Sequence, residues 1–218
     1  MKVLLLGATG RTGKLVQEYL LKNEYSVNVL VRDRNKVKNH SPNLLILEGD
    51  TTNKDDLLRS IRDCDALISV LGISRTSDFP WAKLRTPKEF LSKTMANILH
   101  ISEQVDIKKI VICSAWGVHE TKEHLPGWFR WFIDNSNVGV AYSDHERQET
   151  LLTKSKLNYT IVRPVGLTNS IEEKPVQISQ NNSPKPKLMI SRKDTARFIV
   201  DLLKSHSFPK QAVTISKK

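Results

Sequence analysis

A glycine-rich turn, GATGRTG at residues 7–13, is the first stretch whose residue types and spacing indicate chemistry. Gly7, Gly10 and Gly13 follow the apolar run VLLL and precede the helical pattern KLVQEYLLK. Glycines in such a turn let backbone N–H groups and a helix N-terminus approach an anion, and the pyrophosphate of a dinucleotide fits that description. The spacing is GxxGxxG rather than the more usual GxGxxG. The alternative is a tight strand-to-helix turn that binds no ligand.

Positive side chains near the end of the second apolar run indicate which nucleotide would bind. A cofactor without a 2′-phosphate is usually held there by an acidic residue that accepts the ribose hydroxyls. Here the run ends in Arg32, whose guanidinium can donate two parallel bonds to a 2′-phosphate, and Arg11 and Lys36 add positive charge. We therefore expect NADP(H) to be preferred. NAD(H) stays possible because Asp33 could turn inward, and Arg32 could instead be a surface residue.

The next two apolar runs end in further candidates for nucleotide binding. Asp50 and Thr51 follow the third run and could contact the adenine, although Gly-Asp is also common in turns and helix caps. Leu71 and Gly72 end the fourth run, where the backbone could pass close to a ribose. Each signal is weak alone, but their order along the chain strengthens the prediction of a dinucleotide site.

Strand-like and helix-like segments alternate over the whole sequence. The apolar runs that predict strands span residues 2–7, 26–32, 44–50, 66–72, 108–115, 158–164 and 211–216. Helical periodicity occurs at residues 13–23, 54–63, 87–104, 143–156 and 192–205. This alternation predicts one α/β domain, residues 1–218, with a doubly wound parallel sheet. Ligands of such sheets bind at the carboxyl ends of the strands, where the candidates above lie.

Composition excludes several classes of protein. The net charge of +11 favours acidic partners, but the lysines are scattered and form no basic stripe with aromatics, so we expect no nucleic-acid partner. Cys64 and Cys113 lie in apolar segments without metal-ligand spacing, which predicts reduced thiols and no metal site. No apolar run approaches membrane-spanning length, and the first strand begins at Lys2, so we expect a cytoplasmic protein without a signal peptide or membrane contact.

The motifs together resemble a known family, the atypical short-chain dehydrogenase/reductases, in the branch of biliverdin-IXβ (flavin) reductases. The matching pieces are GATGRTG, VNVLVRDRNKV, EGDTTNKDDL, DALISVLG, VICSA, LNYTIVRPVGLT and ISRKDTARFIV, spread over nearly the whole chain. The resemblance implies a Rossmann fold with a small C-terminal substrate-side region. It also implies NADP binding by Gly7, Thr9, Gly10, Arg11, Thr12, Gly13, Arg32, Asp50, Leu71 and Gly72, with Ser114, Pro164 and Val165 near the nicotinamide.

The catalytic pair of ordinary superfamily members is missing. Those proteins use Tyr-x-x-x-Lys, in which the lysine lowers the tyrosine pKa so that a proton can pass to or from a carbonyl oxygen. Counting back from NYTIVRP puts the lysine position at His145 and the tyrosine position at Ala141. Tyr142 is one residue off, a rotation of about 100 degrees on a helix. We expect it to point elsewhere unless the helix shifts register.

Three side chains remain candidates for catalysis. Ser114, at the end of the fifth run, could orient the nicotinamide amide or a substrate oxygen. His145 could contact the ribose or donate to substrate, and Tyr142 would act only in a shifted register. The structural alternatives are that Ser114 satisfies backbone groups at the strand end and that His145 is an exposed helical residue.

Aromatic residues cluster between Ser114 and His145, at Trp128, Phe129, Trp131 and Phe132. They could stack on a flat substrate, or they could pack against the core or a partner subunit. The run at residues 74–87 is a candidate flap that forms the opposite wall.

The sequence thus predicts an NADPH-dependent oxidoreductase that passes hydride to a flavin, a quinone or a similar small aromatic acceptor, as a monomer or homodimer. Flavin reduction needs no tyrosine acid, because a second proton can come from water. One alternative is a non-catalytic, NmrA-like protein that binds NADP as a redox sensor. Another is an NAD-dependent epimerase or isomerase that uses Tyr142.

Overall fold

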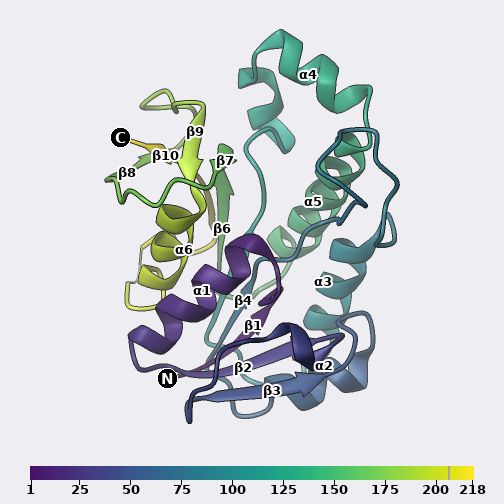
Figure 1. The fold of residues 1–218 in the computed structure, drawn as a ribbon, viewed down its shortest axis with the longest axis vertical. Coiled ribbons are helices and arrows are strands. Elements are labelled where there is room, and N and C mark those ends of the chain that lie inside the picture. The colour runs from purple at the N-terminus through teal and green to yellow at the C-terminus, as the bar shows by residue number, and fades with distance from the viewer. Residues whose placement is uncertain (206) are drawn as a thin grey trace.

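The computed structural model describes residues 1–205 and 207–218, and in it strands and helices alternate as the sequence predicts (Figure 1). The strands are β1 Lys2–Leu6, β2 Ser26–Val31, β3 Leu44–Glu48, β4 Ala66–Ser69, β5 Lys109–Cys113, β6 Tyr159–Pro164, β7 Gly166–Thr168, β8 Val176–Ser179, β9 Met189–Ser191 and β10 Gln211–Lys217. The α-helices are α1 Arg11–Lys22, α2 Lys54–Ile61, α3 Phe90–Ile101, α4 Gly127–Asp134, α5 Val138–Thr153 and α6 Arg192–Asp201. Two 3-10 helices are η1 Arg34–Lys36 and η2 His119–His124.

Eight strands form one sheet in the order β3-β2-β1-β4-β5-β6-β10-β8. Every neighbouring pair is parallel except β10 and β8, which run antiparallel. The chain winds outward from β1 to β3 and then returns to place β4 on the other side of β1. This reversal opens a crevice at the carboxyl ends of β1 and β4, the usual ligand position in such sheets.

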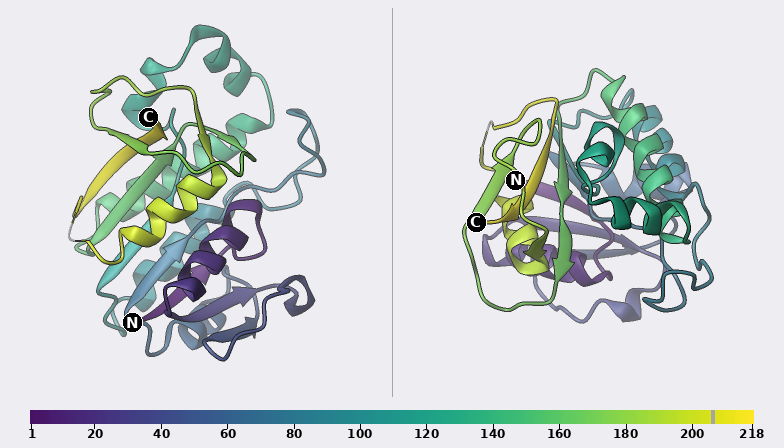
Figure 2. Two further views of the ribbon diagram at one scale, coloured as in Figure 1. Left: turned by 60° about the vertical axis from the view of Figure 1, so that its left-hand side comes forward. Right: turned by 90° about the horizontal axis from the view of Figure 1, so that it is seen from above.

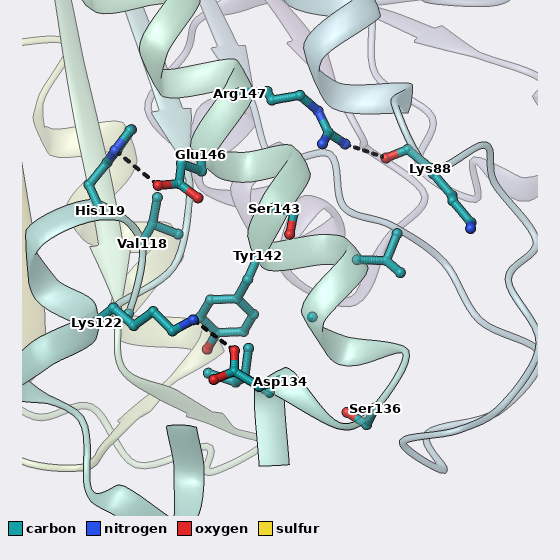
Figure 3. A pocket seen from close by; sticks show the side chains of 14 residues that line it. Lys88, Val118, His119, Lys122, Asp134, Ser136, Tyr142, Ser143, Glu146 and Arg147 are labelled. Atoms are coloured by element: carbon teal, nitrogen blue, oxygen red, sulfur yellow. Dashed lines mark hydrogen bonds and ion pairs between the residues drawn. The ribbon is translucent and has the colours of Figure 1, made fainter. Parts of the chain in front are cut away.

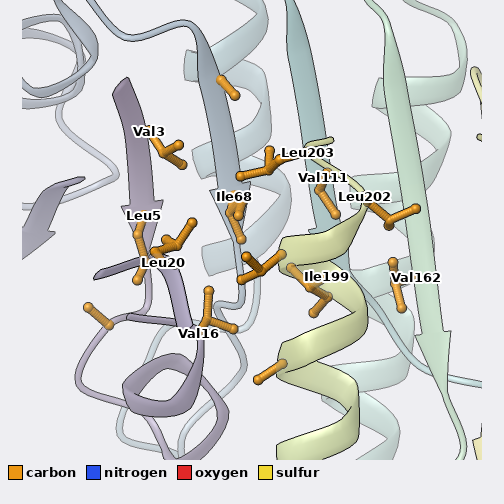
Figure 4. Packing of buried hydrophobic residues seen from close by; sticks show 14 of the residues in the cluster. Val3, Leu5, Val16, Leu20, Ile68, Val111, Val162, Ile199, Leu202 and Leu203 are labelled. Carbon is orange, nitrogen blue, oxygen red and sulfur yellow. The ribbon is translucent and has the colours of Figure 1, made fainter. Parts of the chain in front are cut away.

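The two faces of the sheet bury separate apolar cores. Along β1, Val3 and Leu5 face the core on the α1 and α6 side, whereas Leu4 and Leu6 face the core on the α2, α3 and α5 side. Successive strand side chains point to opposite faces, and strands covered on both faces are apolar throughout. Figure 4 shows α6 and the α1 side chains packed across β1, β4, β5 and β6. The doubly wound parallel sheet predicted from the sequence is therefore confirmed (Figure 2).

Several elements are additional to the strands and helices predicted from the sequence. Helix α4 stands apart from the sheet at one end of the molecule (Figure 1), and β7 and β9 form a second, two-stranded sheet. Strands β7, β8 and β9 make up a small region in the C-terminal part of the chain. These strands have three or four residues and lack the continuous apolar run that indicated the equally short β4.

Both cysteines lie in the apolar core or pack against it. Cys64 and Cys113 are unpaired, and burial raises the pKa of Cys64 to about 11 and that of Cys113 to about 12. Within residues 1–205 and 207–218, no helix has the length and apolar character needed to cross a membrane, and no three potential ligands cluster around a possible metal site.

Candidate functional site

The glycine loop joins β1 to α1 by a turn that only small residues permit. Gly7 has φ +88°, and a β-carbon on it would lie 2.8 Å from the carbonyl oxygen of Val70. The N–H of Gly10 donates to the Gly7 carbonyl at 3.0 Å, which closes the turn. Gly10 also forms the N-cap of α1, with no side chain capping the helix. The first-turn N–H groups of α1 therefore face the crevice edge without a capping side chain, as an anion site requires.

A cavity of about 470 Å³ lies beside this loop at the carboxyl ends of β1 to β4. Its lining includes nine of the predicted cofactor-binding residues, which are Gly7, Thr9, Gly10, Arg32, Lys36, Asp50, Thr51, Leu71 and Gly72. The topology thus brings together candidates that the sequence placed at four separate strand ends. Their convergence gives a polar crevice with the size and backbone exposure that a dinucleotide needs.

The charged residues of the cavity favour a phosphate near β2. Arg32 is exposed to the cavity, and Lys36 lies close by on η1. Asp33, whose inward turn would have favoured NAD(H), instead accepts a bond from the N–H of Asn35 at 3.0 Å and pairs with Lys36 at 3.6 Å. Asp33 is not part of the cavity lining. Arg32 and Lys36 are therefore the charged side chains that a ligand would contact at the end of β2.

Asp50 and Thr51 also perform the local structural roles that the sequence left open. Asp50 accepts bonds from the N–H and hydroxyl of Thr52, each at 2.8 Å. The hydroxyl of Thr51 lies 2.9 Å from that of Thr94 on α3. Both residues nevertheless line the cavity, because these bonds use only part of their capacity.

The remaining predicted cofactor residues lie outside the cavity lining. Gly13 is buried within the loop, Thr12 is half-buried, and Arg11 is exposed and paired with Asp78 at 2.9 Å. Pro164 and Val165 are buried where β6 ends. The Pro164 carbonyl accepts from the N–H of Trp116 at 3.0 Å, and the Val165 N–H donates to Ile215 at 3.1 Å, so both residues tie neighbouring strand ends together.

Comparison with known proteins identifies the fold and the cofactor class. A family model described as NAD(P)H-binding matches residues 7–206. The chain belongs to this NAD(P)H-binding family. An uncharacterised chloroplastic protein of Arabidopsis thaliana is 30% identical over 176 residues, which cover 77% of this chain and 60% of that protein. The chain thus spans about three fifths of that relative's length.

Solved structures share the fold at low sequence identity. A short-chain dehydrogenase/reductase of Veillonella parvula in complex with NADP has a TM-score of 0.81 at 17% identity, over 99% of this chain and 94% of that one. ChuY, an anaerobillin reductase of Escherichia coli O157:H7, also has a TM-score of 0.81, at 18% identity, over 100% of this chain and 97% of that one. This NAD(P)H-binding protein therefore has the Rossmann fold of these reductases along its whole described length.

Several buried side-chain atoms lack partners among the described residues, and Ser69 at the end of β4 is one of them. Two others belong to Ser114 and His145, the candidates for catalysis, which line neither the nucleotide cavity nor the cavity beside Tyr142. The hydroxyl of Ser114 is buried at the end of β5 and makes no hydrogen bond there. His145, on α5, is 8% exposed, and its Nδ1 has no partner. The alternative of an exposed helical histidine is therefore wrong. Burial lowers the pKa of His145 although Glu149 and other neighbours raise it, so the imidazole is neutral at pH 7.

Tyr142 lies on a different side of α5 from the positions of the usual pair. Ala141 packs against the small cluster of Ile73, Phe90 and Leu91, whereas the Tyr142 ring lies against Gly117 on the loop after β5. Burial raises the pKa of Tyr142 to about 12. These contacts agree with the expectation that the Tyr142 side chain points to a different side of α5 from Ala141. A raised pKa is also the opposite of what an acid-base tyrosine needs.

Tyr142 lines a second cavity, of about 430 Å³, that is separate from the nucleotide cavity (Figure 3). Polar contacts surround it, with Lys122 at 2.7 Å from Asp134 and the His119 ring at 3.4 Å from Glu146. The guanidinium of Arg147 donates to the Lys88 carbonyl at 3.2 Å. Lys88 also lines this cavity, and among the described residues its ammonium group has no ion-pair partner (Figure 3).

The aromatic residues of α4 divide between two roles. Phe129 and Phe132 stack with ring centres 6.0 Å apart, and Phe129 packs against the core. Trp128 and Trp131 are 68% and 62% exposed. None of the four lines either cavity. The alternative in which these rings stack on a substrate is therefore not supported, because no ring faces either cavity.

The segment at residues 74–87, called the flap below, does form a wall of the nucleotide cavity. Ser74, Arg85 and Thr86 line the cavity, and sequence reasoning missed all three. The tip of the flap contacts the α4 region, where the indole N–H of Trp81 donates to the Asn135 carbonyl at 2.7 Å. The sequence signal for the flap was the length of the run after the fourth strand, which did not specify which residues turn inward.

Proposed function

We propose that this protein is an NADPH-dependent reductase that passes a hydride to a flavin, a quinone or a similar flat aromatic acceptor. The observation that carries the proposal is the convergence of Arg32 and Lys36 with the glycine loop around one cavity. The bare amides of the loop suit a pyrophosphate, and the two cations suit a 2′-phosphate. The residues present therefore fit NADPH, which when bound would supply a hydride at its nicotinamide ring.

The choice of acceptor rests on the missing tyrosine acid. Ala141 stands at the tyrosine position, His145 is neutral at the lysine position, and the pKa of Tyr142 is raised to about 12. None of these groups suits proton transfer to a carbonyl oxygen by the usual pair. An acceptor that takes its second proton from water needs only to be held against the nicotinamide. ChuY, which shares the fold, carries the name anaerobillin reductase.

Ser114 and His145 are the groups that this chain would offer at the acceptor end. A buried hydroxyl without a partner costs free energy unless a ligand completes its hydrogen bonding. We assign Ser114 to the nicotinamide amide or an acceptor oxygen, and the neutral His145 to a neighbouring hydrogen bond. Both roles position the reactants and require no change in protonation.

Steady-state assays test this function. The purified chain should oxidise NADPH, followed at 340 nm, when FMN, riboflavin or a quinone is added. Ser114→Ala should lower the rate about tenfold or more while NADPH still binds, because the hydroxyl acts at the acceptor end. Gly127→Ala, at a position with open space around it, serves as the matched control and should keep the rate. Binding of NADPH without oxidation by any acceptor would contradict a reductase.

A second candidate is a redox sensor that binds NADP without turnover, which the missing Tyr/Lys pair also allows. Such a protein should bind both NADPH and NADP⁺, and its affinity for a protein partner should depend on which of the two is bound. It should not oxidise NADPH with any acceptor. The epimerase alternative is less well supported, because the raised pKa of Tyr142 opposes its use as a base at neutral pH.

A further inference from the structure

The glycine loop and the flap are joined by a forked ion pair. Arg11 Nη1 donates to Asp78 Oδ2 at 3.0 Å, and Nη2 donates to Oδ1 at 2.9 Å. The side chains are 58% and 80% exposed. Exposed ion pairs contribute little to stability, so a competing anion can replace the Asp78 carboxylate at small cost. The fork is also the geometry in which a guanidinium binds a carboxylate or phosphate of a ligand.

A second guanidinium lies close to this pair. Arg11 is the first residue of α1 and Arg192 is the first residue of α6, and the two helices lie side by side on one face of the sheet (Figure 1). Burial lowers the pKa of Arg192, the charge of Arg11 lowers it further, and the charge of Asp78 opposes them. Arg192 therefore lies near enough to Arg11 and Asp78 for their charges to act on it.

Arg192 has no carboxylate partner of its own. Its Nη1 donates to Asn169 Oδ1 at 2.6 Å and to the Leu167 carbonyl at 3.4 Å, which are both neutral acceptors. Among residues 1–205 and 207–218, no carboxylate oxygen lies within 4.0 Å of this half-buried guanidinium. A partly desolvated cation without a counter-ion is unfavourable, and an anionic ligand would relieve that cost.

We infer that Arg11 and Arg192 bind an acidic group of the acceptor, a carboxylate or a phosphate, and that Asp78 occupies the place of this group when the acceptor is absent. The inference rests on the proposed reductase function and narrows its substrate class. Neither arginine lines the nucleotide cavity, where Arg32, Lys36 and Arg85 already face the ligand. The acceptor is then a flat aromatic molecule with an acidic tail, which also agrees with the net charge of +11.

FMN and riboflavin provide matched probes, because they share the same ring and differ in the phosphate. Binding is measured by flavin fluorescence on the full chain saturated with NADP⁺, so no turnover occurs. We expect wild type to bind FMN at least about tenfold more tightly than riboflavin. Arg11→Gln and Arg192→Gln should each weaken FMN binding about tenfold and change riboflavin binding less than about twofold. Asp78→Asn, on an exposed loop, should strengthen FMN binding because it removes the competing carboxylate.

Lys193→Gln is the matched control for charge. Lys193 neighbours Arg192 but pairs with Glu173 at 3.0 Å, so its loss should leave the preference for FMN unchanged. Equal binding of the two flavins by wild type, no binding of FMN, or weaker FMN binding in Lys193→Gln would overturn the inference. Loss of NADP⁺ affinity in Arg11→Gln or Arg192→Gln would assign the pair to the cofactor instead. Selective FMN binding without any NADPH oxidation would keep this subsite and refute only the reductase.

Discussion

Gly13 packs so tightly against Gly7 that a β-carbon on Gly13 would lie 1.9 Å from the Gly7 carbonyl oxygen. The contact joins the first turn of α1 to the end of β1, and Gly7 itself adopts φ +88°. The spacing of the motif therefore has two causes. Gly7 and Gly10 line the nucleotide cavity, whereas Gly13 lets the helix approach the strand closely enough to present its N-terminus.

Gly13→Ala should abolish NADPH binding and destabilise the fold, because the contacting atoms are backbone and cannot rotate away. We expect a loss of at least about 2 kcal/mol in the free energy of unfolding, within the range for overpacked sites. Urea denaturation and NADPH titration measure the two effects. Gly127→Ala is the matched control, since no atom lies within 4 Å of the added methyl group. Wild-type affinity in Gly13→Ala would show that the loop geometry is not needed for the cofactor.

Tyr142→Phe should leave reduction of FMN within about twofold of wild type. Its pKa is raised to about 12 by burial, so the hydroxyl stays protonated throughout the working range and has no acid-base role. For the same reason, the pH profile of the wild-type rate should show no change caused by titration of Tyr142 between about pH 7 and 9. Initial rates across this range test both statements. A loss of tenfold or more in Tyr142→Phe would mean that the side chain reaches the reacting atoms.

Arg163 anchors a charged network that links stability to pH. On β6 it is bound by the buried Glu149 of α5 at 2.6 Å and by the more exposed Glu120 at 2.5 Å. Burial alone would raise the pKa of Glu120, but the hydrogen bond and charge of Arg163 lower it overall from 4.5. A carboxyl with a lowered folded pKa stabilises the fold above its unfolded pKa, and this contribution is lost as the pH falls through the folded value.

Glu120→Gln should therefore flatten the acid part of the stability profile. Wild type should lose stability as the pH falls below about 4.5, and the variant should lose less over the same range. The difference should stay below about 1 kcal/mol, because the Glu120 side chain is 63% exposed and water screens the pair. Urea unfolding at pH 7 and at pH 4 measures it. Parallel profiles for the two proteins would show that Glu120 does not contribute to the acid dependence.

The sequence predicted the parts of the molecule that depend on local pattern. Unbroken apolar runs such as VLLL marked strands buried on both faces, and the glycine motif marked the turn that joins β1 to α1. Residues at four strand ends converged because parallel strands place their carboxyl ends at one edge of the sheet. These rules need no knowledge of distant contacts.

Contacts between segments far apart in the chain could not be predicted in this way. Arg85 enters the nucleotide cavity, and Asp78 meets Arg11, only because the flap folds back over the crevice. The partnership of Arg163 with Glu149 likewise depends on how β6 packs beneath α5. Helix α4 is short and stands away from the sheet. The pattern of its apolar residues therefore did not indicate which aromatic rings would be buried.

Calorimetric titration of wild type and Arg32→Asp with NADPH and with NADH tests the central claim most directly. The glycine loop should bind either nucleotide, and Arg32 should add a charge-assisted bond to the 2′-phosphate of NADPH alone. We predict one site per chain, tighter binding of NADPH than of NADH, and a loss of about tenfold to a hundredfold in NADPH affinity in Arg32→Asp. NADH affinity should change much less. No heat with either nucleotide, or an unchanged ratio of the two affinities in Arg32→Asp, would contradict the account.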